Sequence, residues 1–272
     1  MTENGIERVA VIGSGVMGAG IAAHCANAGC DVLLLDIVPD GASDRNTLAA
    51  GAIKKMFKSN PEMLMHKSYA KRITAGNIDD DLPLLKDYDW VVEVIIENLE
   101  IKQSLYQKLA EHIGSKTILS SNTSTLPRSA LIEGMDSDLA SRFLITHFFN
   151  PPRYLPLLEV VSGDDVDESV VSQFSEFALV QLGKRVTHCN DTPGFIGNRL
   201  GVYFVQRSIK ATLEHGLTVE QADAMLGRPI GLPKTAVFGL MDLVGIDLIP
   251  HVMSSMLTHL ESDDPFHQIA GA

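Results

Sequence analysis

A histidine and a glutamate twelve residues apart are the side chains of this sequence best suited to acid–base chemistry. His147 follows the short apolar run 143–146, and Glu159 lies inside a second one, 157–161. A carboxylate within an apolar run is costly to bury unless it has a partner, so we expect Glu159 to pair with His147. An imidazole titrates near neutral pH, and a carboxylate on its far nitrogen fixes its tautomer. The pair can therefore remove the hydroxyl proton of an alcohol while a hydride leaves the same carbon.

A glycine-rich turn near the start of the chain lies between an apolar run and a stretch of helix-forming residues. In this context the first glycine permits a tight turn, the second lets the backbone approach a pyrophosphate, and the third lets helix and strand pack closely. The phosphates would lie at the helix N-terminus, where N–H groups and the helix dipole favour anions. The predicted cofactor contacts here are Gly13, Gly15, Val16, Met17 and Gly18.

Asp36 indicates which dinucleotide this turn binds. It ends the next apolar run, 18 residues after Gly18. A carboxylate at this place accepts hydrogen bonds from the adenosine ribose hydroxyls. Residues 37–39 supply no arginine for a 2′-phosphate, which the carboxylate would repel. The sequence therefore predicts NAD rather than NADP.

Two further polar side chains are candidates for the substrate side of the site. Ser124 lies in the polar stretch 120–125, after an apolar run, and the carboxyl ends of strands gather ligands in open α/β sheets. It can hold the substrate oxygen or serve chiefly to contact the cofactor, because such clusters also cap helices and make turns. Asn198 can hold the same oxygen from the C-terminal part of the chain, or it can form a hydrogen bond within the start of a helix.

These residues must be positioned by a sheet in which strands alternate with helices. Continuous apolar runs are typical of parallel strands that are covered on both faces. They predict strands at 8–12, 31–35, 90–94, 117–120, 143–146, 157–161 and 185–188, with helices at 16–28, 100–113 and 167–182. After the turn at 191–194, helical spacing without strands covers 195–215, 218–226 and 237–260. We expect an α/β protein with a Rossmann-type, doubly wound sheet in domain 1–188 and a smaller all-helical domain at 189–272.

Composition excludes several other classes of protein. The net charge of −12 opposes binding to nucleic acid or to anionic membranes, and no apolar stretch approaches the roughly 20 residues of a membrane helix. The polar N-terminus lacks the features of a secretory signal, which favours the cytoplasm. The cysteines Cys25, Cys30 and Cys189 fit no metal spacing and no closed disulfide framework, so we expect reduced core thiols and no metal site.

The motifs taken together resemble the L-3-hydroxyacyl-CoA dehydrogenase family over residues 7 to about 250. The matching segments are Gly-x-Gly-x-Met-Gly at 13–18, Val-Glu-x-Ile-Ile-Glu-Asn at 92–98, Ser-Asn-Thr-Ser at 121–124, His-Phe-Phe-Asn-Pro at 147–151, Glu-Val-Val at 159–161 and Asp-Thr-Pro-Gly-Phe-Ile-Gly-Asn-Arg at 191–199. The resemblance implies NAD-dependent oxidation of an acyl-CoA thioester in fatty-acid β-oxidation. It implies His147 as the base, Glu159 as its orienting partner, and Ser124 and Asn198 in the pocket. It also implies NAD contacts by Asp36, Glu97, Lys102, Asn122, Ser124 and Asn150.

A basic stretch between residues 54 and 72 is a candidate site for the acyl carrier. It holds six lysines and arginines against one acid, in a chain that is acidic overall. Because coenzyme A carries several phosphate charges, Lys54 and Lys55 can bind its 3′-phosphate. The alternative is a solvated helix face.

Two other functions are compatible with the sequence. The chain can be a dehydrogenase of a non-CoA hydroxy acid or a non-enzymatic protein on the same fold.

The basic, glycine- and aromatic-rich segment with which the family continues does not follow here, so we expect a fragment of a longer, multifunctional protein or a shortened one. We expect the apolar residues of 237–260 to be covered in a homodimer.

Overall fold

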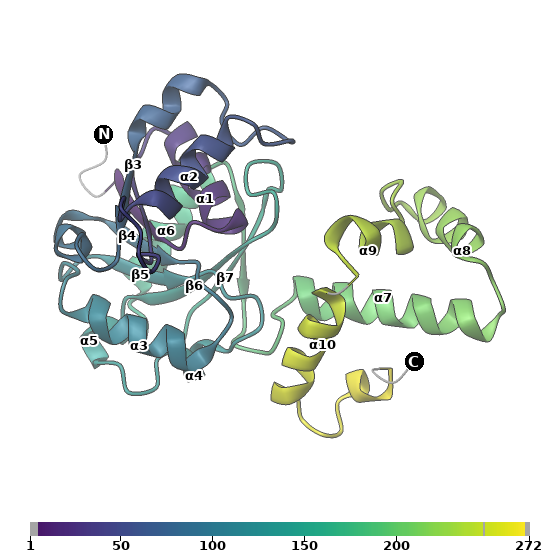
Figure 1. Ribbon diagram of the computed structural model, residues 1–272. Coiled ribbons are helices and arrows are strands. Elements are labelled where there is room, and N and C mark those ends of the chain that lie inside the picture. The colour runs from purple at the N-terminus through teal and green to yellow at the C-terminus, as the bar shows by residue number, and fades with distance from the viewer. Residues whose placement is uncertain (1–4, 247, 270–272) are drawn as a thin grey trace. The chain divides into compact units, whose positions relative to one another are not determined.

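The computed structural model describes residues 5–246 and 248–269, apart from a few side chains in 248–259 that include Ile249, one of the apolar residues expected in the dimer contact. The chain forms two compact units (Figure 1). The first comprises Met1–Thr123 and Pro127–Asp191, and the second comprises Ser124–Leu126 and Thr192–Ala272. The predicted domains, 1–188 and 189–272, differ from these units mainly at 124–126. The side-chain amide of Asn198 donates to the carbonyl of Ser124 at 3.2 Å and helps to hold that segment in the second unit.

The first unit is built on one eight-stranded sheet with the strand order β3-β2-β1-β4-β5-β6-β7-β8. The strands are β1 (Arg8–Ile12), β2 (Asp31–Asp36), β3 (Ile73–Asn77), β4 (Trp90–Glu93), β5 (Ile118–Ser121), β6 (Phe143–Phe148), β7 (Leu157–Val161) and β8 (Arg185–Cys189). All neighbouring pairs are parallel except β6 and β7, which are antiparallel. The order reverses between β1 and β4, so this is a doubly wound sheet whose ligands bind beyond the strand ends at the switch point. The predicted Rossmann-type sheet is confirmed.

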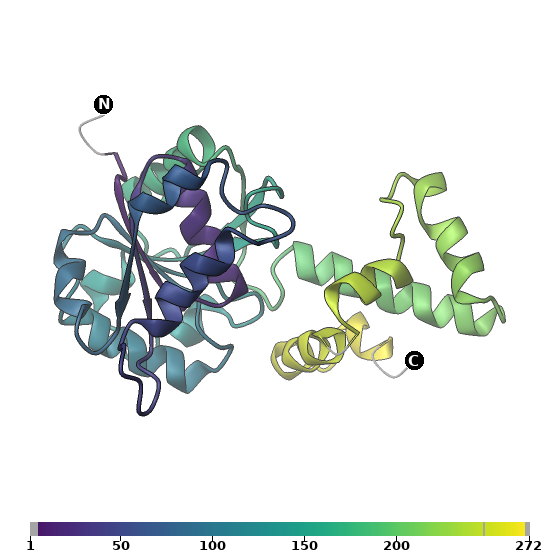
Figure 2. The ribbon, with the colours of Figure 1, turned by 45° about the horizontal axis from the view of Figure 1, so that its top comes forward.

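Helices cover both faces of the sheet, which explains why its strands are apolar on both sides (Figures 1 and 2). One face carries α1 (Val16–Asn27), α2 (Thr47–Met56) and α6 (Glu168–Glu176), which a π-helical turn extends over Phe177–Gln181. The other face carries α3 (Leu99–Ala110), α4 (Arg128–Leu131) and α5 (Ser137–Ala140). Short 3₁₀ turns lie at Lys67–Arg72 and Leu82–Asp87. Beneath α6 the fully buried Trp90 stacks on Phe148 and meets the edges of Phe174 and Phe177.

One strand is absent from the sequence prediction. β3 pairs in parallel with β2 at the edge of the sheet. Its sequence, Ile-Thr-Ala-Gly-Asn, contains residues that are depleted in strands, and a 3₁₀ turn leads into it. Pairing with β2 and contacts with α2 therefore stabilise this strand, although its residues have a low propensity for strands.

The described part of the second unit is helical, as predicted, and contains no strand. It consists of α7 (Gly197–Glu214), α8 (Val219–Leu226), α9 (Phe238–Val244) and α10 (Leu248–His259), with 3₁₀ turns at Arg228–Ile230 and Pro265–Gln268. The single helix predicted over 237–260 is wrong. It breaks at Gly245, whose φ of 106° is a conformation that glycine adopts readily.

The core of the second unit lies between α10 and the C-terminal 3₁₀ turn. Met253 and Met256 on α10 pack there with Phe266 and Ile269. Part of the apolar surface that we expected a second chain to cover is therefore buried within the unit. Leu243 and Ile246 remain 75% and 63% exposed.

Candidate functional site

The predicted base and its partner lie opposite each other on two neighbouring strands. His147 and Glu159 are a register pair of the antiparallel β6 and β7, so the backbone ladder sets their separation. His147 Nδ1 lies 2.7 Å from Glu159 Oε2, and their side chains are 7% and 1% exposed. Because Nδ1 faces the carboxylate, Nε2 is the ring nitrogen that faces away from it. This is the geometry of a histidine that takes up a proton at Nε2 while a buried carboxylate stabilises the imidazolium.

The glycine turn at the end of β1 fits a dinucleotide pyrophosphate. Gly13 has a φ of 105°, and a Cβ there would lie 2.5 Å from the Val94 carbonyl oxygen. A Cβ on Gly18 would lie 1.8 Å from the Gly13 oxygen, so helix and strand pack too closely for any side chain. Apart from Gly15 and its neighbours along the chain, no atom of the described residues lies within 4 Å of the position that a Cβ on Gly15 would take. The backbone at Gly15 is therefore open to a phosphate at the N-terminus of α1, where Val16 and Met17 form the first turn.

Asp36 lies beside this turn, at the carboxyl end of β2. Its carboxylate accepts hydrogen bonds from the backbone N–H and the hydroxyl of Ser14 and, at 2.7 Å, from the N–H of Ile37. The carboxylate is thus fixed next to the glycine turn. A carboxylate can accept about four hydrogen bonds, so Asp36 retains capacity for a ribose hydroxyl.

The other predicted cofactor residues follow β4, β5 and β6. Asn122 is held by its side-chain oxygen, which accepts the N–H of Phe148 at 2.9 Å. Asn150 is exposed just beyond β6. Glu97 is exposed and accepts a hydrogen bond from the Thr123 hydroxyl at 2.5 Å. Lys102 differs from these residues because its side chain is 1% exposed.

Lys102 is part of a buried network that the sequence reasoning missed. Its ammonium lies 2.6 Å from Glu93 Oε1 and 3.4 Å from Glu97 Oε2. Glu93 also accepts the hydroxyls of Tyr106 and Ser121, each at 2.7 Å. The sequence carried a signal for this network. Glu93 lies within the apolar run 91–96, and a carboxylate in such a run needs a partner, as Glu159 does.

Lys184 was also missed, and it fixes the loop that follows Asn150. Its ammonium donates to the carbonyl of Pro152 and, at 2.8 Å, to the carbonyl of Leu155, and the residue is 2% exposed. Burial lowers the pKa of Lys184 to about 8. Nothing in the sequence around Lys184 distinguishes it from a surface lysine.

Ser124 and Asn198 lie in the second unit and contact each other. The bond from the Asn198 side chain goes to the backbone carbonyl of Ser124. Asn198 therefore positions the Ser124 backbone from the first turn of α7. This bond reaches residue 124 and is not the bond within the start of the helix that we considered for Asn198. The contact of Asn198 with the substrate oxygen stays a prediction.

The predicted lysines for the acyl carrier lie on α2, next to a groove. Lys54 and Lys55 are both exposed in its last turn. The groove has a volume of about 670 Å³, and its lining includes Gly15, Asp36, Lys55 and Lys58. It joins the glycine turn to the basic end of α2, so a phosphate-bearing adenosine group fits its chemistry.

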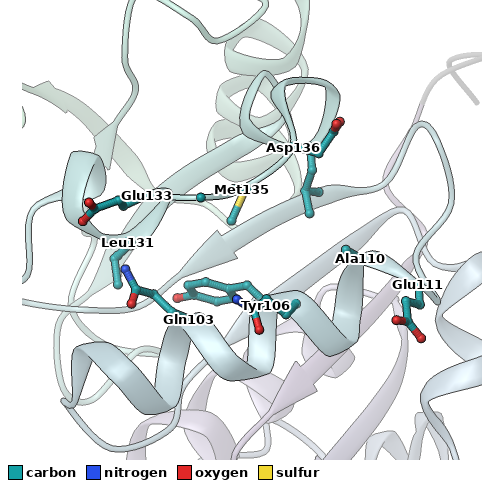
Figure 3. A pocket seen from close by; sticks show the side chains of 11 residues that line it. Gln103, Tyr106, Ala110, Glu111, Leu131, Glu133, Met135 and Asp136 are labelled. Carbon is teal, nitrogen blue, oxygen red and sulfur yellow. The ribbon is translucent and has the colours of Figure 1, made fainter.

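A second cavity, of about 290 Å³, lies between α3 and residues 131–139. Figure 3 shows Gln103 and Tyr106 on α3 facing Leu131 and Met135. None of the predicted site residues lines this cavity. Tyr106 links it to Glu93.

Two classes of site are not found in the part of the chain that the structure describes. No helix there is long and apolar enough to cross a membrane. No group of three or more His, Cys, Asp or Glu side chains there could hold a metal ion. Cys25, Cys30 and Cys189 are buried, and none of the three forms a disulfide.

Both parts of the chain match known protein families. Residues 8–192 match the family described as 3-hydroxyacyl-CoA dehydrogenase, NAD binding domain. Residues 194–270 match the family described as 3-hydroxyacyl-CoA dehydrogenase, C-terminal domain.

Individual relatives agree with these matches. A protein of Deinococcus radiodurans named "probable 3-hydroxyacyl-CoA dehydrogenase" is 46% identical over 96% of this chain, which spans 75% of its length. A Bacillus subtilis protein with the same name is 40% identical over 95% of the chain, which spans only 35% of its length. The crystal structure of Mycobacterium tuberculosis FadB2 aligns with a TM-score of 0.82 and 29% identity, covering 97% of this chain and 90% of that one.

Proposed function

Because the chain belongs to the 3-hydroxyacyl-CoA dehydrogenase family, we propose that it oxidises the 3-hydroxyl group of an L-3-hydroxyacyl-CoA to a ketone with NAD, in fatty-acid β-oxidation. The observation that carries this proposal is the buried pair of His147 and Glu159, with 2.7 Å between Nδ1 and Oε2. The pair provides a base beside the strand ends at which the sheet binds a dinucleotide. A non-enzymatic protein on this fold does not require a buried pair of this kind.

In this reaction a proton leaves the hydroxyl oxygen and a hydride leaves the carbon that bears it. His147 takes the hydroxyl proton at Nε2, and the Glu159 carboxylate stabilises the imidazolium that forms. NAD, when bound, accepts the hydride. Ser124 holds the substrate oxygen, and Asn198 supports it through the Ser124 backbone.

The cofactor is held by the glycine turn and by polar side chains at the strand ends. Gly13, Gly15 and Gly18 shape the turn that receives the pyrophosphate. Val16 and Met17 offer their N–H groups at the start of α1, and Asp36 binds the adenosine ribose. Glu97, Lys102, Asn122 and Asn150 complete the set of contacts.

The acyl carrier binds at the basic end of α2. Lys54 and Lys55 meet the phosphate of coenzyme A, and Lys55 also lines the groove of about 670 Å³ that contains the proposed NAD contacts Gly15 and Asp36. A charge contact of this kind distinguishes a thioester of coenzyme A from a free hydroxy acid.

The protein acts as a cytoplasmic homodimer. Support for the dimer comes from the second unit, where Leu243 and Ile246 of the predicted contact are 75% and 63% exposed. A self-complementary contact of two such faces removes apolar surface from water. Fractionation of cells that produce the protein at its natural level tests the location, and recovery with membranes or organelles would contradict it.

An NADH absorbance assay tests the function. L-3-hydroxyacyl-CoA thioesters of several chain lengths are compared with the matching free 3-hydroxy acids and with the D-thioesters. We expect NADH to form from the L-thioesters alone. Faster oxidation of the free acids would support the non-CoA alternative, and NADH binding without turnover of either class would support the non-enzymatic one.

A further inference from the structure

Glu93 accepts four hydrogen bonds and lies at the switch point of the sheet. It ends β4, between the ends of β1 and β5, and is 0% exposed. Oε1 accepts the Lys102 ammonium at 2.6 Å and the Ile95 N–H at 2.7 Å. Oε2 accepts the hydroxyls of Tyr106 and Ser121. The four hydrogen bonds fix the carboxylate in one orientation.

The two hydroxyl donors keep this carboxylate from turning. Burial, and next the nearby Glu93 charge, raise the pKa of Tyr106 well above its usual value, so its hydroxyl remains a donor. The ring of Tyr106 also lines the cavity between α3 and residues 131–139 (Figure 3). Glu93 is thus held from the α3 side by Tyr106 and from the β5 side by Ser121.

The Lys102 ammonium depends on Glu93 for its position. A lysine ammonium buried to 1% exposure must have its charge and its N–H donors satisfied within the protein, and Glu93 supplies the nearest charged acceptor, at 2.6 Å. Its other acidic neighbour, Glu97, is farther away, at 3.4 Å, and its side chain is 34% exposed. Without the Glu93 charge the buried ammonium would lack its nearest counter-charge. We therefore expect it to turn toward Glu97 and water.

The network continues from Lys102 to the edge of the cofactor site. Glu97 accepts the hydroxyl of Thr123 through Oε1, the oxygen that does not face Lys102. Thr123 follows Asn122, which in turn holds the Phe148 N–H. A buried charge in the sheet is therefore connected through two side chains to a loop that carries a proposed NAD contact.

From these contacts we propose that Glu93 is a positioning residue of the NAD site, which fixes the ammonium of Lys102 and, through Lys102, the carboxylate of Glu97. The Glu93 carboxylate accepts four hydrogen bonds from donors within the protein, so it acts on the cofactor site through its partners. This inference rests on the proposed roles of Lys102 and Glu97 as NAD contacts and does not depend on which alcohol is oxidised.

A double-mutant cycle on NADH binding tests the proposal without any turnover. NADH fluorescence is titrated with the full chain and with the variants Glu93→Gln, Lys102→Met and Glu93→Gln/Lys102→Met. We expect each single change to weaken binding about tenfold and the double change to weaken it no more than about twofold further, because both act on one ammonium. Losses that multiply to about a hundredfold, or wild-type affinity in folded Glu93→Gln, would overturn the proposal.

Asp165→Asn is the matched control. Like Glu93→Gln, this change turns a carboxylate that pairs with a buried cation into an amide. Asp165 Oδ1 lies 2.7 Å from the guanidinium of Arg128, which is 3% exposed. We expect it to lower the melting temperature and to leave NADH affinity within twofold of wild type. If it weakens NADH binding as much as Glu93→Gln does, the effect of Glu93 is a general loss of stability and the proposal fails.

Glu93→Asp keeps the test decisive if Glu93→Gln does not fold. It retains the charge but withdraws the carboxylate by about 1.5 Å, one carbon–carbon bond. We expect it to fold and to bind NADH several-fold more weakly, and unchanged affinity would refute the positioning role. Wild-type protein that binds NADH but does not oxidise hydroxyacyl-CoA would refute the proposed function while leaving this test intact.

Discussion

Replacement of Glu159 by glutamine tests the chemistry most directly, because the change keeps the shape of a side chain that is 1% exposed and removes its charge. The lost interaction is the bond of 2.7 Å to His147 Nδ1. Hydrogen bonds to charged groups contribute about 1.5–3 kcal/mol. Since about 1.4 kcal/mol corresponds to a factor of ten in rate, this loss alone lowers kcat about 10- to 150-fold.

A second effect adds to the first. The glutamine amide can donate to His147 Nδ1, and the ring proton must then sit on Nε2, the nitrogen that has to accept the substrate proton. We therefore expect Glu159→Gln to lower kcat about 10²- to 10³-fold. We expect His147→Gln, which removes the base itself, to lower it about 10²- to 10⁴-fold.

The assay is NADH formation at saturating NAD and hydroxyacyl-CoA, with NADH affinity measured separately by fluorescence. His188→Gln is the control, because His188 is an exposed histidine on the neighbouring strand, paired with Val160. It should retain wild-type kcat. If Glu159→Gln keeps more than about half of kcat while binding NADH normally, Glu159 does not stabilise the imidazolium. If His147→Gln keeps more than a tenth, another residue is the base.

Three further predictions concern cofactor choice, acid stability and assembly. Asp36→Ala should weaken NAD binding about tenfold and narrow the preference over NADP, measured by titration of both; equal affinity of the wild type for both would refute the ribose contact. Burial, and next the Lys184 charge, lower the pKa of His24 to about 4. Unfolded His24 takes up a proton near pH 6.5 whereas the native side chain resists it until about pH 4, so native stability falls over this range. The melting temperature of His24→Gln should therefore fall less than that of the wild type between pH 7 and pH 4.5, and parallel losses would contradict the assignment. Light scattering should give about twice 29.5 kDa for the wild type and a monomer for Leu243→Glu; a wild-type monomer would refute the dimer.

The sequence was sufficient for the family, the NAD cofactor and the fold class, all of which are confirmed. These depend on patterns that the chain carries locally: the glycine spacing before α1, and apolar runs that only a two-sided sheet can bury. The pairing of His147 with Glu159 was also predictable, because a carboxylate inside an apolar run requires a partner. The individual contacts with NAD and substrate stay predictions.

What the sequence did not reveal depends on tertiary contacts. β3 forms because β2 offers it an edge, although its Gly76 and Asn77 are poor strand residues. Lys102 was expected as a cofactor contact from the family resemblance alone, which does not indicate that Lys102 is buried against Glu93. The break at Gly245 was missed because the apolar spacing continues through it, and a φ of 106° has no signature beyond the glycine itself.

The antiparallel pairing of β6 and β7 has a consequence for how this protein tolerates change. The two chemical partners face each other across a ladder, so the loop 149–156 between them does not set their separation. A residue inserted in that loop leaves the pair intact, whereas a slip of one residue within either strand turns its side chain to the opposite face of the sheet. A change in the length of this loop therefore affects the proposed NAD contact Asn150 and the carbonyls that Lys184 holds, while the acid–base pair next to it keeps its geometry.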